Sequence, residues 1–143
     1  MFKLLSKLAA FVESKNYGFK TVAPLVSFSF QGKRQDYPIC LFDVISNVPS
    51  ETKDGTSTVD FVRVRIEVIG KQLDDCITKS DQLRVDLDFT TQIDGVTIKF
   101  NDQATTYEDE AEVFVIQNDY ICRTEREATP TQVFTDTFTK EFE

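Results

Sequence analysis

The segment from Asp60 to Leu87 changes its hydrophobic period once, and this change constrains the fold more than any other feature. From Asp60 to Ile69 apolar and charged side chains alternate, which is typical of a strand with one buried face. From Leu73 the apolar side chains recur at helical spacing. The expected apolar stripe consists of Leu73, Cys76, Ile77, Ser80, Leu83 and Leu87. A strand followed at once by an amphipathic helix predicts a sheet with a helix packed on it.

Weaker patterns on either side predict the remaining elements. An amphipathic helix is expected over residues 2–13, and further strands over 21–30, 37–42, 92–100 and 111–122, the last with a register shift near Asn118 and Asp119. Residues 47–55 are expected to form a loop. The sequence therefore predicts a single domain with two amphipathic helices and a sheet of about four to six strands. We place this domain at residues 1–126 and a C-terminal arm at residues 127–143.

The charge is negative overall but unevenly distributed. The formal net charge of the 143-residue chain is -8, which disfavours general binding to nucleic acid. The first twenty residues are basic, because Lys3, Lys7, Lys15 and Lys20 face only Glu13. A basic end and an acidic body could attract neighbouring copies, although a solvated helix face explains the lysines equally well.

The residues that usually carry catalysis or bind metals are missing or badly spaced. The chain has no histidine, and its three cysteines are far apart among apolar residues, as expected for buried free thiols. A calcium loop starting at Asp86 would need glycine at Thr91 and glutamate at Thr97. A metal-dependent nuclease motif fails because Glu67 and Lys71 are four residues apart. We expect no enzyme activity, no cofactor and no bound metal.

Two sets of residues are candidates for contact with a partner or another subunit. Arg63, Arg65 and Glu67 share one face of a strand, which is either a solvated face or a contact surface for acidic groups. The acidic targets on a neighbouring copy would be residues 74–75 or 108–110. In the C-terminal arm, Phe134, Phe138 and Phe142 are spaced four apart, and the arm docks either on its own domain or on a neighbouring subunit.

Four short segments resemble a known family. Residues 37–41, 62–70, 81–87 and 118–122 are similar, in order, to a tyrosine-proline strand, an apolar-charged strand, a helix ending near arginine and leucine, and a final Asp-Tyr strand. These features look like the minor tail proteins of tailed phages called tail completion or tail terminator proteins, which act as head-tail connectors. The resemblance spans about residues 1–125, while the phenylalanine-containing arm after Glu127 departs from it.

The resemblance implies an α+β domain with two helices packed on a mixed or antiparallel sheet. It also implies that the protein is a structural virion protein. Members of the family form a homo-oligomeric ring, a hexamer or a multiple of six, at the head-tail junction or the head-proximal end of the tail. The implied partners are further copies of the chain, the tail tube and the portal or head-completion proteins, with DNA at most passing through the ring. The implied location is the virion, tail or neck, after assembly in the host cytoplasm. Lys7 interrupts the apolar N-terminus, so neither a signal peptide nor a membrane segment is expected.

Two rival functions remain open at this stage. The first is a small cytoplasmic adaptor whose exposed aromatic side chains bind a protein. The second is a metal-dependent enzyme that uses aspartates, which would require clustered carboxylates in a pocket.

Overall fold

The computed structural model describes residues 2–25, 36–49 and 59–125. In chain order its elements are α1 (Phe2–Lys15), β1 (Thr21–Pro24), β2 (Ile39–Pro49), β3 (Val59–Gly70), α2 (Leu73–Leu87), β4 (Val96–Glu108) and β5 (Val113–Glu125). The strands form a five-stranded sheet in the order β1-β2-β3-β5-β4. Because β1 is parallel to β2 and the other neighbours are antiparallel, the sheet is mixed, which confirms the predicted α+β class.

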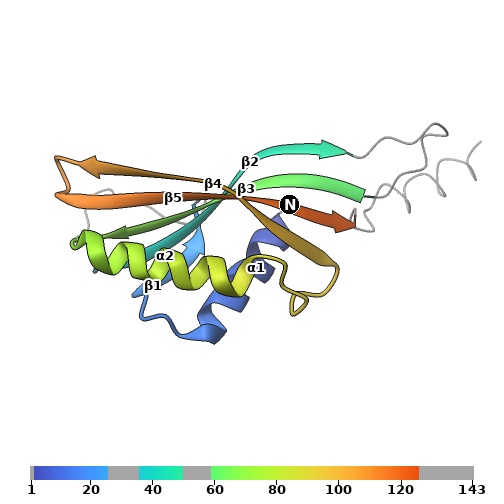
Figure 1. The fold of residues 1–143 in the computed structure, drawn as a ribbon, viewed down its shortest axis with the longest axis horizontal. Coiled ribbons are helices and arrows are strands. Elements are labelled where there is room, and N and C mark those ends of the chain that lie inside the picture. Colours follow the sequence, from blue (N-terminus) through green and yellow to red (C-terminus); the bar gives the residue numbers. More distant parts are fainter. Residues whose placement is uncertain (1, 26–35, 50–58, 126–143) are drawn as a thin grey trace, which may run out of the picture.

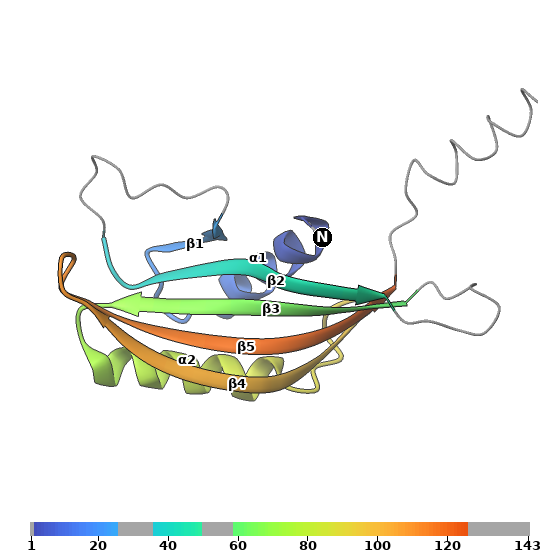
Figure 2. The same cartoon turned by 90° about the horizontal axis from the view of Figure 1, so that it is seen from above.

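Both helices cover the same face of the sheet (Figure 1). α1 contacts β1 and β2 at one edge, whereas α2 contacts β3, β5 and β4 toward the other edge (Figure 2). The result is a two-layer domain in which, among the described residues, both helices lie on one face of the sheet and none lies on the other.

The main core lies between the helices and the sheet. Its buried helix residues include Leu4, Leu5, Leu8, Phe11 and Val12 from α1 and Cys76, Leu83 and Leu87 from α2. β3 contributes alternate residues from Val62 to Val68, as the period of two predicted. Burial of each such large aliphatic side chain stabilises the fold by about 1.5–3 kcal/mol. The three cysteines are buried and free, as expected.

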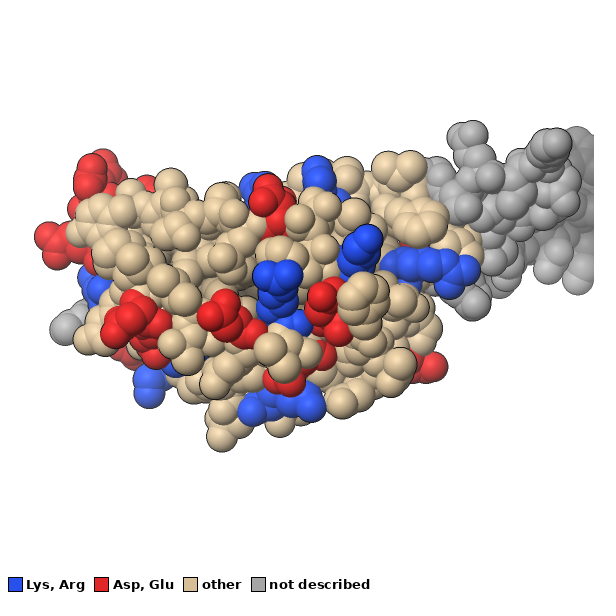
Figure 3. All heavy atoms as spheres, viewed as in Figure 1, with Lys and Arg blue, Asp and Glu red and all other residues tan. Residues whose placement is uncertain are grey.

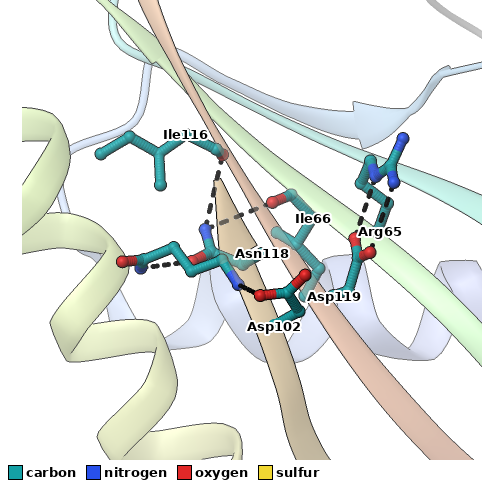
Figure 4. Close-up of polar contacts among 7 residues, drawn as sticks. Arg65, Ile66, Asp102, Ile116, Asn118 and Asp119 are labelled. Carbon is teal, nitrogen blue, oxygen red and sulfur yellow. Dashed lines mark hydrogen bonds and ion pairs between the residues drawn. The ribbon is translucent and has the colours of Figure 1, made fainter. Parts of the chain in front are cut away.

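A buried amide ties α2 to the sheet. Asn118 on β5 is fully buried, and its Nδ2 donates to the Ile66 carbonyl at 3.3 Å (Figure 4). The same Nδ2 also donates to Ser80 Oγ on α2 at 3.2 Å. Its Oδ1 accepts a hydrogen bond of 2.8 Å from Gln103 Nε2 on β4. The amide of Asn118 thus forms hydrogen bonds with β3, α2 and β4. A buried amide is tolerated when its polar atoms have such partners.

The register shift expected in β5 near Asn118 and Asp119 is wrong. β5 pairs with β3 without interruption, and the irregularity lies in β4, between Phe100 and Asp102. The apolar residues of β5 change from odd to even positions, because the side of the strand that is buried changes from the helix-free face to the face that carries the helices. Val113 and Val115 enter a second small cluster on the helix-free face, whereas Ile116, Tyr120 and Cys122 point to the helices.

Two predicted boundaries and one predicted buried residue also differ from the structure. β2 continues through Asn47 to Pro49, so the start of the expected loop is strand, because these residues pair with β3. β4 extends to Glu108 through pairing with β5. Ile77 was expected in the buried stripe of α2 but is 43% exposed. Of the strand expected over 21–30, residues 26–30 lie outside the described residues.

Candidate contact surfaces

The helix-free face of β2, β3, β5 and β4 carries the first set of candidate residues. Arg63, Arg65 and Glu67 share this face, as predicted, because the residues between them are buried under the helices. Strand pairing arranges the face in rows. One row holds Leu41, Glu67, Gln117 and Ala104; the next holds Asp43, Arg65, Asp119 and Asp102; the third holds Ser46, Arg63, Ile121 and Lys99. We call these three rows the open face.

Arg65 forms an ion pair with Asp119 of the same chain. Its Nε donates to Asp119 Oδ1 at 2.9 Å and its Nη2 to Asp119 Oδ2 at 3.3 Å, a two-pronged contact between neighbouring strands (Figure 4). The side chains are 31% and 12% exposed, respectively. The hydrogen bond from Arg65 to Asp119 raises the pKa of the guanidinium. The charge of Arg65 is therefore already compensated within the domain.

Glu67 lies on the open face in surroundings that disfavour its ionised form. Its side chain is half-buried, and burial raises the pKa of its carboxyl group, with Asp43, Glu108 and Asp119 adding repulsion that Arg65 opposes. An ionised Glu67 consequently costs folding energy, which a cationic partner group would reduce.

Unlike Arg65, Arg63 forms no ion pair with an acidic residue in the described part of the chain. It is exposed and lies beside Ile121, which is flanked on its other side by Lys99. Arg123 lies two residues beyond Ile121 on β5 and pairs with Phe61 on β3. The side chain of Phe61 is 40% exposed. Arg63, Lys99 and Arg123 with Phe61 thus form a cationic patch with apolar side chains among the charges. This composition suits contact with an acidic surface.

Sequence reasoning found the shared face but missed its main internal contact. Asp119 is 54 residues from Arg65, and only the pairing of β3 with β5 brings the two together. The pairing expected with residues 74–75 or 108–110 of a neighbouring copy stays a prediction. Phe134, Phe138 and Phe142 lie outside the described residues, so the role of the arm stays a prediction.

The β4 edge is the second exposed feature. Every residue from Asn101 to Glu112 is exposed, and β4 is the last strand on its side of the sheet. Acidic residues Glu108, Asp109, Glu110 and Glu112 gather at the hairpin tip between β4 and β5, at the left end of Figure 3. A long edge strand presents unpaired backbone groups to a partner.

Neither a metal site nor a membrane span is found in the part of the chain that the structure describes. Among those residues, no group of three or more Cys, Asp or Glu is arranged to hold a metal ion. Within the same ranges no helix is long and apolar enough to cross a membrane.

Comparison with known proteins identifies a shared fold rather than a family. No protein-family model and no curated protein matches the sequence. Among solved structures, the fold is similar to a chain described as "Virion of native gene transfer agent (GTA) particle", with a TM-score of 0.55 and 14% sequence identity. The match covers 82% of this chain and 84% of that chain. At this identity, the likeness shows that the two chains share a fold over most of their lengths.

Proposed function

We propose that this protein is a structural component of a phage-like virion and forms a homo-oligomeric ring at the head-tail junction or the head-proximal end of the tail. The observation that carries the proposal is the fold shared with a chain of a gene transfer agent virion, which spans more than four fifths of both chains. The sequence resemblance to tail completion and terminator proteins points to the same kind of particle independently of this match.

The surfaces of the domain suit assembly better than chemistry. The open face presents Arg63, Lys99 and Arg123, and the β4 edge offers backbone groups for pairing. Chains that repeat in a closed ring need two different surfaces, one for each neighbour, and this sheet ends in two different strands, β1 and β4. The proposed partners beyond the ring are the tail tube and the portal or head-completion proteins.

The purified full-length protein tests the ring. Native mass spectrometry should show a single closed assembly of six copies or a multiple of six, and negative-stain microscopy should show rings with a central opening. A monomer at all concentrations that binds a cellular protein would instead support the adaptor function and contradict the proposal.

A reconstitution experiment tests the location. Particles assembled without this protein are expected to have tails of irregular length or tails detached from heads, and adding the purified protein should restore joined particles. Irregular tail length would assign it to tail termination, and detached tails of normal length would assign it to the neck. Normal particles in its absence would refute both.

Truncation after residue 126 separates the domain from the arm. We expect the shortened protein to remain folded, because the main core is built from residues 4–122. Ring formation or docking should weaken if the arm reaches a neighbour. Loss of the folded state on truncation would refute this division of the chain.

A further inference from the structure

The two helices lie at opposite edges of the sheet and carry charges of opposite sign. α1 contacts β1 and β2, whereas α2 contacts β3, β5 and β4 (Figure 2). α1 contains three lysines and one glutamate, while α2 contains four aspartates, one lysine and one arginine. A second copy displaced by the width of the sheet would therefore bring its basic helix next to the acidic helix of the first.

The outer side of α2 has the features of a contact surface. Ile77, Val85 and Phe89 are 43%, 80% and 66% exposed, and Asp81 lies between the first two at a spacing of four residues. A shallow open hollow of about 320 Å³ is lined by Thr78, Asp81, Gln82, Val85 and Asp86. Acidic side chains are visible along this helix in Figure 3. The surface is both apolar and negatively charged, and Asp81 has no ion-pair partner in the described ranges.

The outer side of α1 bears small side chains, and the helix has a net positive charge, with exposed Glu13 as its one acidic residue. Ser6, Ala10 and Ser14 are exposed and recur every four residues, so the ridge between them is low. Exposed Lys3 and Lys15 lie at the two ends of the helix. Rows with a spacing of four on two helices can pack against each other, and small residues in one row let the larger residues of the other approach closely.

We propose that α1 of one copy packs against the outer side of α2 of the next copy in a head-to-tail contact. This inference rests on the proposed ring. The charges select the orientation, because an α1-to-α1 or α2-to-α2 contact would bring like charges together. A head-to-tail contact uses a different surface on each partner and repeats until the rotation closes a ring. Copies with a net charge of -8 repel one another overall, so association depends on local pairing of this kind.

Two charge-reversal variants of the full-length chain test the contact. The first carries Lys3→Glu and Lys15→Glu on α1, and the second carries Asp74→Lys and Asp81→Lys on α2. Each variant alone should associate about tenfold more weakly than the wild type at low salt, because the helices then meet with like charges. An equimolar mixture should regain the assembly, since each variant then offers a surface that the other can bind.

The α2 variant distinguishes local charge pairing from overall charge repulsion. Its substitutions reduce the net negative charge, so a purely global repulsion would predict stronger association rather than weaker. A control with Asp36→Lys and Asp94→Lys makes the same change of charge at exposed positions off both helices and off the open face, and it should assemble at least as well as the wild type. Sedimentation velocity and native mass spectrometry give the assembly state, and circular dichroism shows that each variant is folded.

The possible outcomes distinguish a failure of the proposed helix contact from a failure of the proposed ring. Rings that form normally in both variants would overturn the helix contact and leave the proposed function standing. Folded variants whose mixture does not reassemble would also overturn it. A wild-type protein that stays monomeric at every concentration would overturn the ring and this contact with it.

Discussion

Replacing Arg65 with methionine should destabilise the domain far more than replacing Arg63, although both arginines lie on the same face of β3. Arg65 makes two hydrogen bonds of 2.9 and 3.3 Å to Asp119, whose side chain is only 12% exposed. Without Arg65 this carboxylate stays largely out of water and uncompensated. Hydrogen bonds to charged groups contribute about 1.5–3 kcal/mol, so the partial exposure of Arg65 suggests a loss of about 2 kcal/mol.

Arg63 is the matched control. It is exposed and forms no ion pair within the described part of the chain, so Arg63→Met should cost less than about 0.5 kcal/mol. If it contacts a neighbouring subunit, this substitution should weaken assembly while leaving the stability of the monomer unchanged. The two arginines would then have separate roles, Arg65 in the fold and Arg63 in the contact.

Urea unfolding followed by far-ultraviolet circular dichroism measures both effects. With a denaturant slope of about 2 kcal/mol per molar, Arg65→Met should lower the midpoint by about 1 M. A double-mutant cycle with Asp119→Asn should give a coupling free energy of about 1–2 kcal/mol. Equal midpoints for Arg63→Met and Arg65→Met, or a coupling near zero, would refute the assignment.

Three further predictions concern the interior and the open face. A Cβ at Gly70 would lie 2.8 Å from Cys76 Sγ, so Gly70→Ala should cost about 1–3 kcal/mol and should be partly rescued by Cys76→Ala in thermal unfolding; additive losses would contradict the clash. The pKa of Glu67 is raised on folding, so the folded state favours its protonated form, and this stabilisation is present at low pH and lost as the pH rises. Glu67→Gln should therefore stabilise the domain at pH 7 and have little effect at pH 3; a gain that is independent of pH would argue against burial of the charge. Burial raises the pKa values of the Cys40, Cys76 and Cys122 thiols, to about 11 for Cys76 and about 12 for Cys122, so a thiol reagent at pH 8 should modify all three only after denaturation, and rapid labelling of the native protein would contradict their burial.

Local periodicity predicted the elements that bury one regular face. α2 was predicted with its observed ends, and β3 to within one residue at each end, because their apolar residues follow a single period. The second half of β4 gave no signal, since residues 101–108 are exposed on both faces and are strand only through pairing with β5. The face change in β5 imitated a register shift, because it depends on which elements cover the sheet at each point.

The open face was predictable only in part, for a similar reason. Alternation along one strand placed Arg63, Arg65 and Glu67 together, but it could not supply their neighbours on β5 and β4. Asp119 and Lys99 reach the same face through strand pairings that no local pattern encodes. The sequence therefore predicts which residues share a face, whereas the fold decides which of them are already compensated.

The buried Asn118 amide has a mechanical consequence for the proposed assembly. Its hydrogen bonds join α2 through Ser80, β3 through the Ile66 carbonyl and β4 through Gln103. Displacing α2 along the sheet would break the hydrogen bond from Asn118 to Ser80, and a load on the helix would pass through this one amide to β3, β4 and β5. In the proposed head-to-tail contact, a neighbour bound to α2 would thus pull on three strands of the sheet rather than on the helix alone.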